Sequence, residues 1–286
     1  MTYGAQEIQP HSLKSVLYHI VCLLLCIIML YPLLWMVFSS FKETNAVFTT
    51  AATLIPERWT LDNYVNGWRG FLGTSFGVFF KNSLFVTVIA TIGAVFSSVI
   101  IAFGFARLKF SGSKVWFACM MLTMMLPFQV LMVPQYLLYN KLGWVGTYLP
   151  LIVPYFFGQG FFIFLDVQFI QGIPKELDEA ARIDGCSTWG LFLRVILPLV
   201  VPALVTSGVF SFIWRWEDFL APLLYLNRVP SYTMAIALKM FSDPTAQSDW
   251  GAMFAMSTLS LVPAFIIFAV FQKYLVEGIA TTGLKG

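Results

Sequence analysis

Charged side chains are scarce in this chain of 286 residues: Asp, Glu, Lys and Arg make up 11% of it, against 59% hydrophobic residues. A soluble domain carries about a quarter charged residues, so the deficit indicates that lipid surrounds much of the chain. The net charge is only +3, and no block of Lys or Arg forms a basic stretch. These features argue against a nucleic-acid-binding protein.

Several enzyme and energy-coupling motifs are also missing. The phosphate-binding pattern G-x-x-x-x-G-K-[ST] requires a Gly-Lys step, which does not occur, so the chain cannot power transport by that route alone. It has no H-E-x-x-H motif and no cluster of metal ligands, and we predict no serine in a strained G-x-S-x-G turn. The chain is therefore not expected to be an enzyme or to hold a metal.

The few charges leave six long uncharged intervals of 27, 25, 26, 24, 20 and 23 residues, whereas the next longest has 13. A charge at mid-bilayer costs about 2.5–3.5 kcal/mol on insertion scales, and about twenty helical residues cross the hydrocarbon core. The intervals are Ser15–Phe41, Asn82–Ala106, Val115–Asn140, Leu142–Leu165, Val195–Trp214 and Trp250–Gln272. We predict an all-α membrane protein with six transmembrane helices, whose first helix, over about residues 15–41, is retained and not cleaved as a signal peptide.

The short loops predict the orientation in the membrane. The loop after the second interval carries Arg107, Lys109 and Lys114, whereas the loop after the third carries only Lys141. Cytoplasmic loops are enriched in Lys and Arg, so we predict that both termini are cytoplasmic and that residues 42–81 and 215–249 are outside. The bias over all loops is small, with nine basic residues inside and eight outside.

The intervals carry packing and bending signals but little acid-base chemistry. Small residues recur every four positions from Ala90 to Ala106 and predict a close helix contact. Kinks are permitted by the prolines at Pro127, Pro134, Pro150, Pro154, Pro198, Pro202 and Pro263. His19 is the one acid-base group near neutrality in the intervals, so we expect no charged residue at mid-depth and no proton relay.

Three glutamines in the intervals are neutral hydrogen-bonding groups. Gln129, Gln135 and Gln159 could line a path for a polar substrate, or they could bond neighbouring helices.

The fourth loop, over about residues 171–194, is unusually polar. Residues 173–185 predict one short helix, because acids lie in its first turn and Arg182 follows Asp178 by four positions. Gly185 suits the position just after the helix.

An apolar strip on this short helix predicts a protein partner. The strip consists of Leu177, Ala180, Ala181 and Ile183. A helix lying on lipid normally shows bulky apolar and basic residues, whereas this helix is acidic and its strip is shallow. The strip therefore favours the cleft of a cytoplasmic protein.

The same loop carries a motif with fixed spacing. Glu179, Ala180 and Ala181 are followed after three residues by Gly185, and after nine more by Val195, Leu197 and Pro198. This pattern resembles the E-A-A signature of permease subunits of binding-protein-dependent ABC importers, with Val195 in place of the usual Ile. The chain is similar throughout to the maltose-type carbohydrate-uptake permeases, at Asn82, Ser83, Pro134, Tyr136, Leu142, Gly143, Trp216, Asp218, Phe219, Pro222, Leu223 and the ending Gly283–Gly286.

The resemblance implies a type I importer fold, with residues 1–286 forming a single transmembrane permease domain in the bacterial cytoplasmic membrane. It implies that the E-A-A loop docks into a cleft of an ATPase subunit, where Glu179 meets a basic group and Gly185 allows the turn between two short helices. The expected docking residues are Glu179, Ala180, Ala181, Asp184, Gly185 and Pro198.

The resemblance also implies the partners. They are a second, related permease in a heterodimer, two ATPase subunits and an extracytoplasmic solute-binding protein. ATP and Mg²⁺ would be bound by the ATPase, so this chain is expected to hold no cofactor. The expected substrate is a carbohydrate, in particular an oligosaccharide.

Two alternatives belong to other classes. A secondary transporter or channel that works without ATP leaves the acidic loop unexplained. A membrane enzyme would depend on Asp166, Glu217 and Asp218 as its polar groups.

Overall fold

The computed structural model describes residues 13–242 and 249–283, and this part of the chain contains helices and connecting segments but no β-strand. The longer helices are α1 (Leu13–Ser39), α3 (Asp62–Arg69), α4 (Phe76–Arg107), α5 (Ser113–Met124), α6 (Phe128–Lys141), α8 (Gly160–Gly172), α9 (Glu176–Ile183), α12 (Val201–Trp216), α14 (Met234–Phe241) and α15 (Trp250–Gly283). The shorter ones are α2 (Ala46–Thr49), α7 (Leu149–Ile152), η1 (Val153–Phe157), α10 (Thr188–Leu191), η2 (Phe192–Ile196), α11 (Leu197–Leu199), α13 (Leu220–Tyr225) and η3 (Val229–Ser231).

The predicted count of six transmembrane helices is confirmed if two bent pairs each form one span. Four unbroken segments are long and apolar enough, namely Ser15–Ser39, Phe76–Arg107, Leu149–Gly172 and Trp250–Tyr274. The bent pairs are Ser113–Met124 with Phe128–Lys141, at 100°, and Thr188–Leu199 with Val201–Trp216, at 73°. Counted in that way, each predicted interval corresponds to one span, and the third and fifth are broken.

Proline accounts for both breaks. Pro127 lies between α5 and α6, where it lacks an amide donor and disfavours a helical conformation at Leu126. Pro198 follows the π-helical turn η2, and Pro202 begins the helix beyond the second bend. A proline ring collides with the carbonyl four residues earlier, so the wider π turn relieves the collision at Pro198. Pro263, by contrast, lies inside the continuous helix α15.

The fourth span corrects one prediction. Its helices begin at Leu149 and run to Gly172, whereas the uncharged interval ended at Leu165. Asp166 therefore lies inside the span and is fully buried, so the predicted end of this span at Leu165 is wrong. Ser207 of α12 donates a hydrogen bond to Asp166 Oδ1 over 3.4 Å, and the carboxylate thus lies at the contact between α8 and α12.

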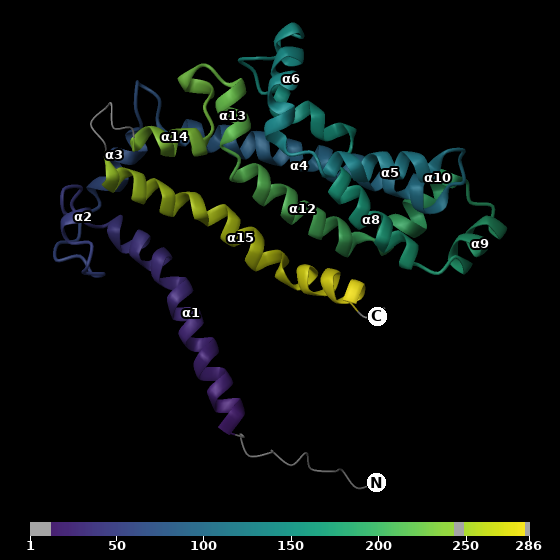
Figure 1. The fold of residues 1–286 in the computed structure, drawn as a ribbon, viewed down its shortest axis with the longest axis horizontal. Coiled ribbons are helices and arrows are strands. Elements are labelled where there is room, and N and C mark those ends of the chain that lie inside the picture. The colour runs from purple at the N-terminus through teal and green to yellow at the C-terminus, as the bar shows by residue number, and fades with distance from the viewer. Residues whose placement is uncertain (1–12, 243–248, 284–286) are drawn as a thin grey trace.

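Helix α4 is the central rod of the molecule. Its small residues Ala90, Ala94, Ser98 and Ala102 are fully buried, which confirms the predicted close contact, here with α8 and α12. Figure 1 shows α9 and α10 at one end of the molecule and α3 and α14 at the other.

The loops gather at these two ends in the groups that the sequence predicts. Asn82 Nδ2 donates hydrogen bonds to the carbonyls of Pro230 and Tyr232 over 2.9 and 3.0 Å. Thr44 Oγ1 donates to Asp249 Oδ1 over 3.1 Å. The stretches predicted to be outside thus contact each other, and the loop after α4 lies with α9 at the opposite end.

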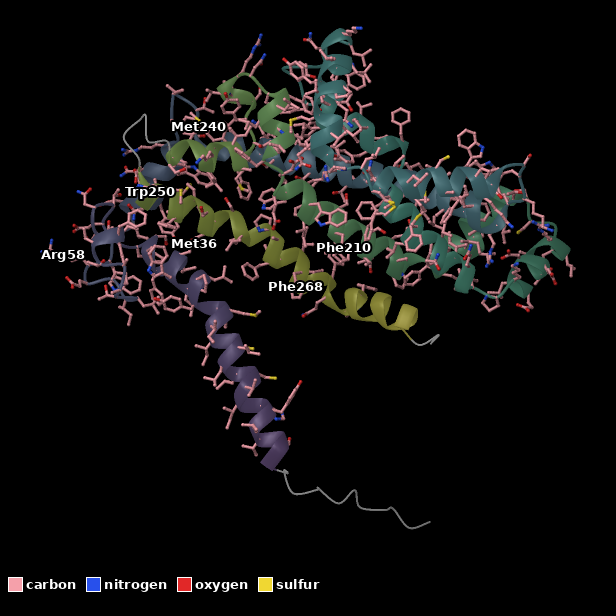
Figure 2. All side chains as sticks on the ribbon, in the orientation of Figure 1. Met36, Arg58, Phe210, Met240, Trp250 and Phe268 are labelled. Carbon is pink, nitrogen blue, oxygen red and sulfur yellow. The ribbon has the colours of Figure 1, made fainter. Side chains whose placement is uncertain are left out.

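Helix α1 stands away from the rest of the chain. The C-terminal end of α1 contacts α15, whereas the rest of α1 diverges from the bundle (Figure 1). None of the residues in the most apolar stretch of α1 is buried. The side chains of α1 project freely along most of its length (Figure 2). Such a surface requires lipid or another membrane protein around it.

Candidate functional site

The fourth loop folds as two short helices around a glycine turn. At the end of α9 the amide of Cys186 donates to the Ala181 carbonyl over 2.9 Å, and that of Gly185 donates to the Arg182 carbonyl over 3.0 Å. These two bonds form a Schellman motif, which requires a left-handed residue, and Gly185 has φ +79°. Ser187 then caps α10 by accepting from the amide of Gly190 over 3.1 Å. The predicted glycine turn is confirmed.

Most of the predicted docking residues are exposed, on α9, in the turn after it and, for Pro198, in α11. Glu179, Ala180, Asp184, Gly185 and Pro198 are exposed. The predicted strip needs one correction, because Ala181 is only 8% exposed and packs inward against the transmembrane helices. The exposed apolar side chains are Leu177, Ile183 and Trp189, of which Ile183 is 86% exposed. We call Leu177, Ala180, Ile183 and Trp189 the loop surface.

The acidic turn of α9 is held from outside the loop. Asp178 forms an ion pair with Arg107, the last residue of α4, with 3.0 Å between Asp178 Oδ2 and Arg107 Nε. Arg182, four residues after Asp178, is exposed. The four-residue spacing in the sequence pairs Asp178 with Arg182 and does not indicate Arg107. Arg107 is nevertheless marked in the sequence as the first charge after an uncharged interval of 25 residues.

A second site is a polar cavity of about 450 Å³ where α12 ends and α13 begins. It is lined by Phe128, Gln135, Tyr139, Pro150, Pro154, Tyr155, Gln159, Trp214, Arg215, Asp218, Ala221 and Tyr225. Of the three glutamines singled out from the sequence, Gln135 and Gln159 line this cavity. Gln129 is exposed and lies outside the lining.

Hydrogen bonds orient the cavity's polar groups. The Tyr225 hydroxyl donates to Gln135 Oε1 over 3.4 Å. Burial, with smaller contributions from Tyr139 and Asp218, raises the pKa of Tyr225 to about 12, so the phenol keeps its proton at neutral pH. Gln159 Nε2 donates to the carbonyl of Gly158 over 3.1 Å. Because this bond anchors the amide nitrogen of Gln159, the side-chain oxygen is the group that can accept a hydrogen bond from a ligand.

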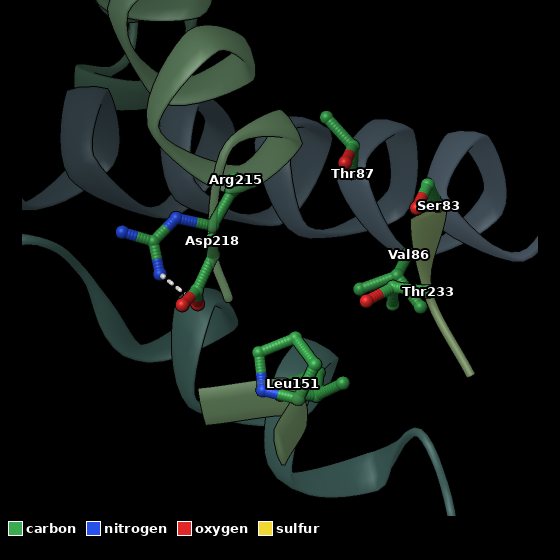
Figure 3. A pocket seen from close by; sticks show the side chains of 8 residues that line it. Ser83, Val86, Thr87, Leu151, Arg215, Asp218 and Thr233 are labelled. Carbon is green, nitrogen blue, oxygen red and sulfur yellow. Dashed lines mark ion pairs between the residues drawn. The ribbon is translucent and has the colours of Figure 1, made fainter. Parts of the chain in front are cut away.

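An ion pair forms one wall of the cavity. Arg215 Nη1 lies 3.8 Å from Asp218 Oδ2 (Figure 3). Arg215 also donates to the Tyr155 hydroxyl, and its guanidinium carbon lies 4.4 Å from the centre of that ring. Burial raises the pKa of the Asp218 carboxyl above its usual range, and the nearby Arg215 opposes that shift. The cation is thus compensated by its neighbours and is not a free charge.

A smaller enclosed space lies on the other side of this ion pair. Its volume of about 10 Å³ matches one water molecule. Ser83 and Thr87 of α4 line it together with Thr233, and Figure 3 shows these side chains on one side of the Arg215–Asp218 pair. The ion pair therefore lies between the polar cavity and the central helix α4.

The groups considered for a membrane enzyme do not converge. Asp166 is buried between helices, Glu217 is exposed, and Asp218 is paired with Arg215. The sequence does contain a G-x-S-x-G pattern, at residues 73–77. There Ser75 is the N-cap of α4 and follows a turn closed by the isolated bridge between Phe71 and Thr74. A nucleophile elbow instead places its serine between a strand and a helix.

A multi-pass helical bundle with two broken spans, a polar cavity and an exposed helical loop defines a membrane transport subunit. Residues 94–281 match the family described as binding-protein-dependent transport system inner membrane component. The chain belongs to this family, whose members work with a solute-binding protein.

Relatives agree over nearly the whole chain. The probable ABC transporter permease protein YurM of Bacillus subtilis is 37% identical over 257 residues, or 90% of this chain and 84% of the relative. The trehalose/maltose transport system permease protein MalG of Thermococcus litoralis is 31% identical, covering 96% of this chain and 98% of the relative. The arabinooligosaccharides transport system permease protein AraQ of Halalkalibacterium halodurans is 31% identical, covering 91% and 92%. The chain is thus a transport permease subunit and not an enzyme.

A solved structure shares the fold. A chain of a bacterial ABC transporter involved in the import of the acidic polysaccharide alginate matches with a TM-score of 0.82, covering 96% of this chain and 99% of that one. The sequence identity is 20%. The likeness confirms the predicted importer permease fold.

Proposed function

We propose that this chain forms half of the pore of an ATP-driven importer and that its substrate is a neutral oligosaccharide. The observation that carries this proposal is the polar cavity, because its aromatic rings, amides and compensated ion pair match the chemistry of a sugar. Relatives named for arabinooligosaccharides and for trehalose and maltose support the same substrate class.

The cavity lining supports a sugar by two kinds of contact. Tyr139, Tyr155, Tyr225 and Trp214 line the cavity with rings that combine apolar surface and a polar edge, which suits a pyranose ring that is apolar on its faces and hydroxylated at its rim. Gln135 and Gln159 add amide groups that bond hydroxyls. We expect a neutral substrate because the positive charge of Arg215 is already offset by Asp218 and covered by the Tyr155 ring.

The loop surface supports docking of an ATPase. It consists of exposed apolar residues on the two short helices α9 and α10 between two spans, and the acidic Glu179 is next to Ala180 in α9. In this proposal ATP and Mg²⁺ bind to two ATPase subunits, and Glu179 meets a basic group in their cleft. Pro198 and the π turn before it would let the following span bend as the loop moves.

The remaining predictions complete this proposal. The loop surface faces the cytoplasm with both termini, and the contacting stretches 42–81 and 215–249 face the binding protein outside. The chain forms one permease domain, and the exposed apolar helix α1 lies against lipid and the second permease of a heterodimer.

The test is a purification of the full-length tagged chain from solubilised membranes after photocrosslinking from Ile183, the most exposed residue of the loop surface. The same crosslinker at Trp116, an exposed residue of α5, is the matched control. We expect a nucleotide-hydrolysing subunit to be joined at Ile183 and not at Trp116. Recovery of the chain without such a subunit, from membranes in which it supports sugar uptake, would contradict the proposal.

A further inference from the structure

Arg107 ties the fourth loop to the central helix at two points. Its Nε lies 3.0 Å from Asp178 Oδ2, and only 3% and 13% of the two side chains are exposed. Its Nη2 donates a hydrogen bond to the carbonyl of Ile173 over 2.7 Å. One guanidinium thus holds both the segment that enters the loop and the first turn of α9.

The chemistry of this contact requires arginine. The planar guanidinium donates a hydrogen bond to the Ile173 carbonyl while its delocalised charge faces the Asp178 carboxylate, whereas a lysine ammonium is a single point charge. Because both partners are withdrawn from water, removal of one leaves the other buried and uncompensated. The pair is therefore unlike a surface salt bridge, which contributes little.

Apolar packing around the ion pair joins the same elements. Ala102 and Phe103 of α4 share one buried cluster with Ala181 of α9 and Phe192 of η2. The rings of Phe103 and Phe192 have centroids 5.0 Å apart. Interiors packed in this way transmit displacement and do not deform freely. The loop and the adjacent end of α4 thus form one rigid body.

The other half of α4 reaches the small space behind the Arg215–Asp218 pair, and this pair in turn lines the polar cavity. The helix has 32 residues without an internal proline, which corresponds to a length of about 48 Å. Near its far end Ser83 accepts a hydrogen bond from the amide of Met234 over 2.8 Å. Ser83 and Thr87 also line the small space beside the Arg215–Asp218 pair. A displacement at Arg107 can therefore reach the wall of the polar cavity through a single helix.

We propose that Arg107 is a positioning residue that clamps α9 to α4, so that a push on the loop surface moves α4 and, with it, the ion pair at the polar cavity. This inference rests on the proposed function only in that an ATPase supplies the push.

The test compares variants of the complete importer in proteoliposomes, with substrate uptake and ATP hydrolysis measured on the same preparation. Arg107→Ala and Asp178→Asn each remove a buried charge-assisted contact, and we expect the uptake per ATP to fall by about tenfold or more. Arg107→Lys keeps the charge but not the two-point geometry and should retain an intermediate ratio. Lys109→Ala, which removes an exposed cation two residues further on, should leave the ratio within about twofold.

The reversed pair separates a clamp from a mere folding requirement. In the double variant Arg107→Asp with Asp178→Arg the ion pair can form again, and we expect uptake per ATP to recover at least threefold over either single reversal. An unchanged ratio in Arg107→Ala would overturn the proposal, and so would a reversed pair that assembles but recovers nothing.

A distance measurement tests the clamp even where a variant fails to transport. Spin labels are placed at Lys109 and Glu176, both exposed, in the full chain with its four cysteines replaced by serine. We expect one narrow distance distribution that stays the same with and without ATP, and a broad one in Arg107→Ala. A distribution equally narrow in Arg107→Ala would overturn the clamp. A lack of ATP-dependent uptake in the unmodified importer would instead contradict the proposed function. The distance measurement would still test the clamp in that case.

Discussion

The loop surface and the polar cavity differ in how the sequence builds them. The loop surface lies within residues 177–189, and its shape follows from local rules: an acidic first turn, a left-handed glycine and a serine cap. The polar cavity gathers residues from Phe128 to Tyr225, which come from α6, α7, η1, α12 and α13 and the segments between them. A docking surface can thus be local, whereas a pore lining depends on how separate helices pack.

The largest effect is expected where the local rules are broken together, in Glu179→Ala with Gly185→Ala. An alanine in the left-handed conformation and a lost charged contact each cost about 1–2 kcal/mol, so uptake should fall by about 100-fold. Uptake into proteoliposomes measures this effect, with Lys114→Ala, which removes an exposed cation in the first turn of α5, as the control. Full ATP-dependent uptake in the double variant would show that the loop surface is not the docking site.

The next largest effect is expected at the wall of the polar cavity, in Arg215→Gln. Asp218 would then be half-buried without its cation, at a cost of about 1.5–3 kcal/mol, and uptake should fall by about tenfold or more. Adding Asp218→Asn removes the unpaired charge and should restore most of the uptake. Arg228→Gln, at an exposed cation of the same outer stretch, is the control. A double variant no better than the single would mean that the charge balance is not what matters.

Tyr225→Phe should have a moderate effect, because it deletes the phenol that bonds Gln135 but keeps the ring. One neutral hydrogen bond contributes about 1 kcal/mol, so the substrate concentration for half-maximal uptake should rise by about fivefold. Tyr18→Phe, on the exposed face of α1, should change nothing. An unaltered concentration dependence in Tyr225→Phe would remove this phenol from the substrate path.

The smallest effect is expected at Gln129, which sharpens the comparison between cavity and surroundings. Gln129→Ala should leave the half-maximal concentration within twofold, whereas Gln135→Ala should raise it by about threefold to tenfold, because only Gln135 lines the cavity. Measurement of uptake by both variants over a range of substrate concentrations tests this prediction. Equal losses in both would contradict the assignment of the cavity as the path.

Much of the fold could be predicted because charge marks the membrane boundary so clearly. Four of the six intervals correspond to unbroken spans and the other two to the bent helix pairs, and the small-residue stripe from Ala90 to Ala102 is the buried face of α4. The rule failed at Asp166, since it ends a span at every charge and cannot recognise a carboxylate that a neighbouring helix receives through Ser207.

The sites were predictable to different degrees. The glycine turn after α9 needed only the local sequence, but the inward direction of Ala181 depends on packing against α4. Likewise Gln129 and Gln135 have the same chemistry, and only the assembled helices place one in the cavity and the other outside it. The clamp between Arg107 and Asp178 joins positions 71 residues apart (178 − 107), a contact that periodicity and spacing do not reveal.

The most direct test of the whole account is sugar uptake by proteoliposomes that hold this chain and its partner permease, with and without the ATPase subunits. We predict that a neutral oligosaccharide accumulates only when the ATPase, ATP and the binding protein are present together. Uptake at the same rate without the ATPase would contradict the account.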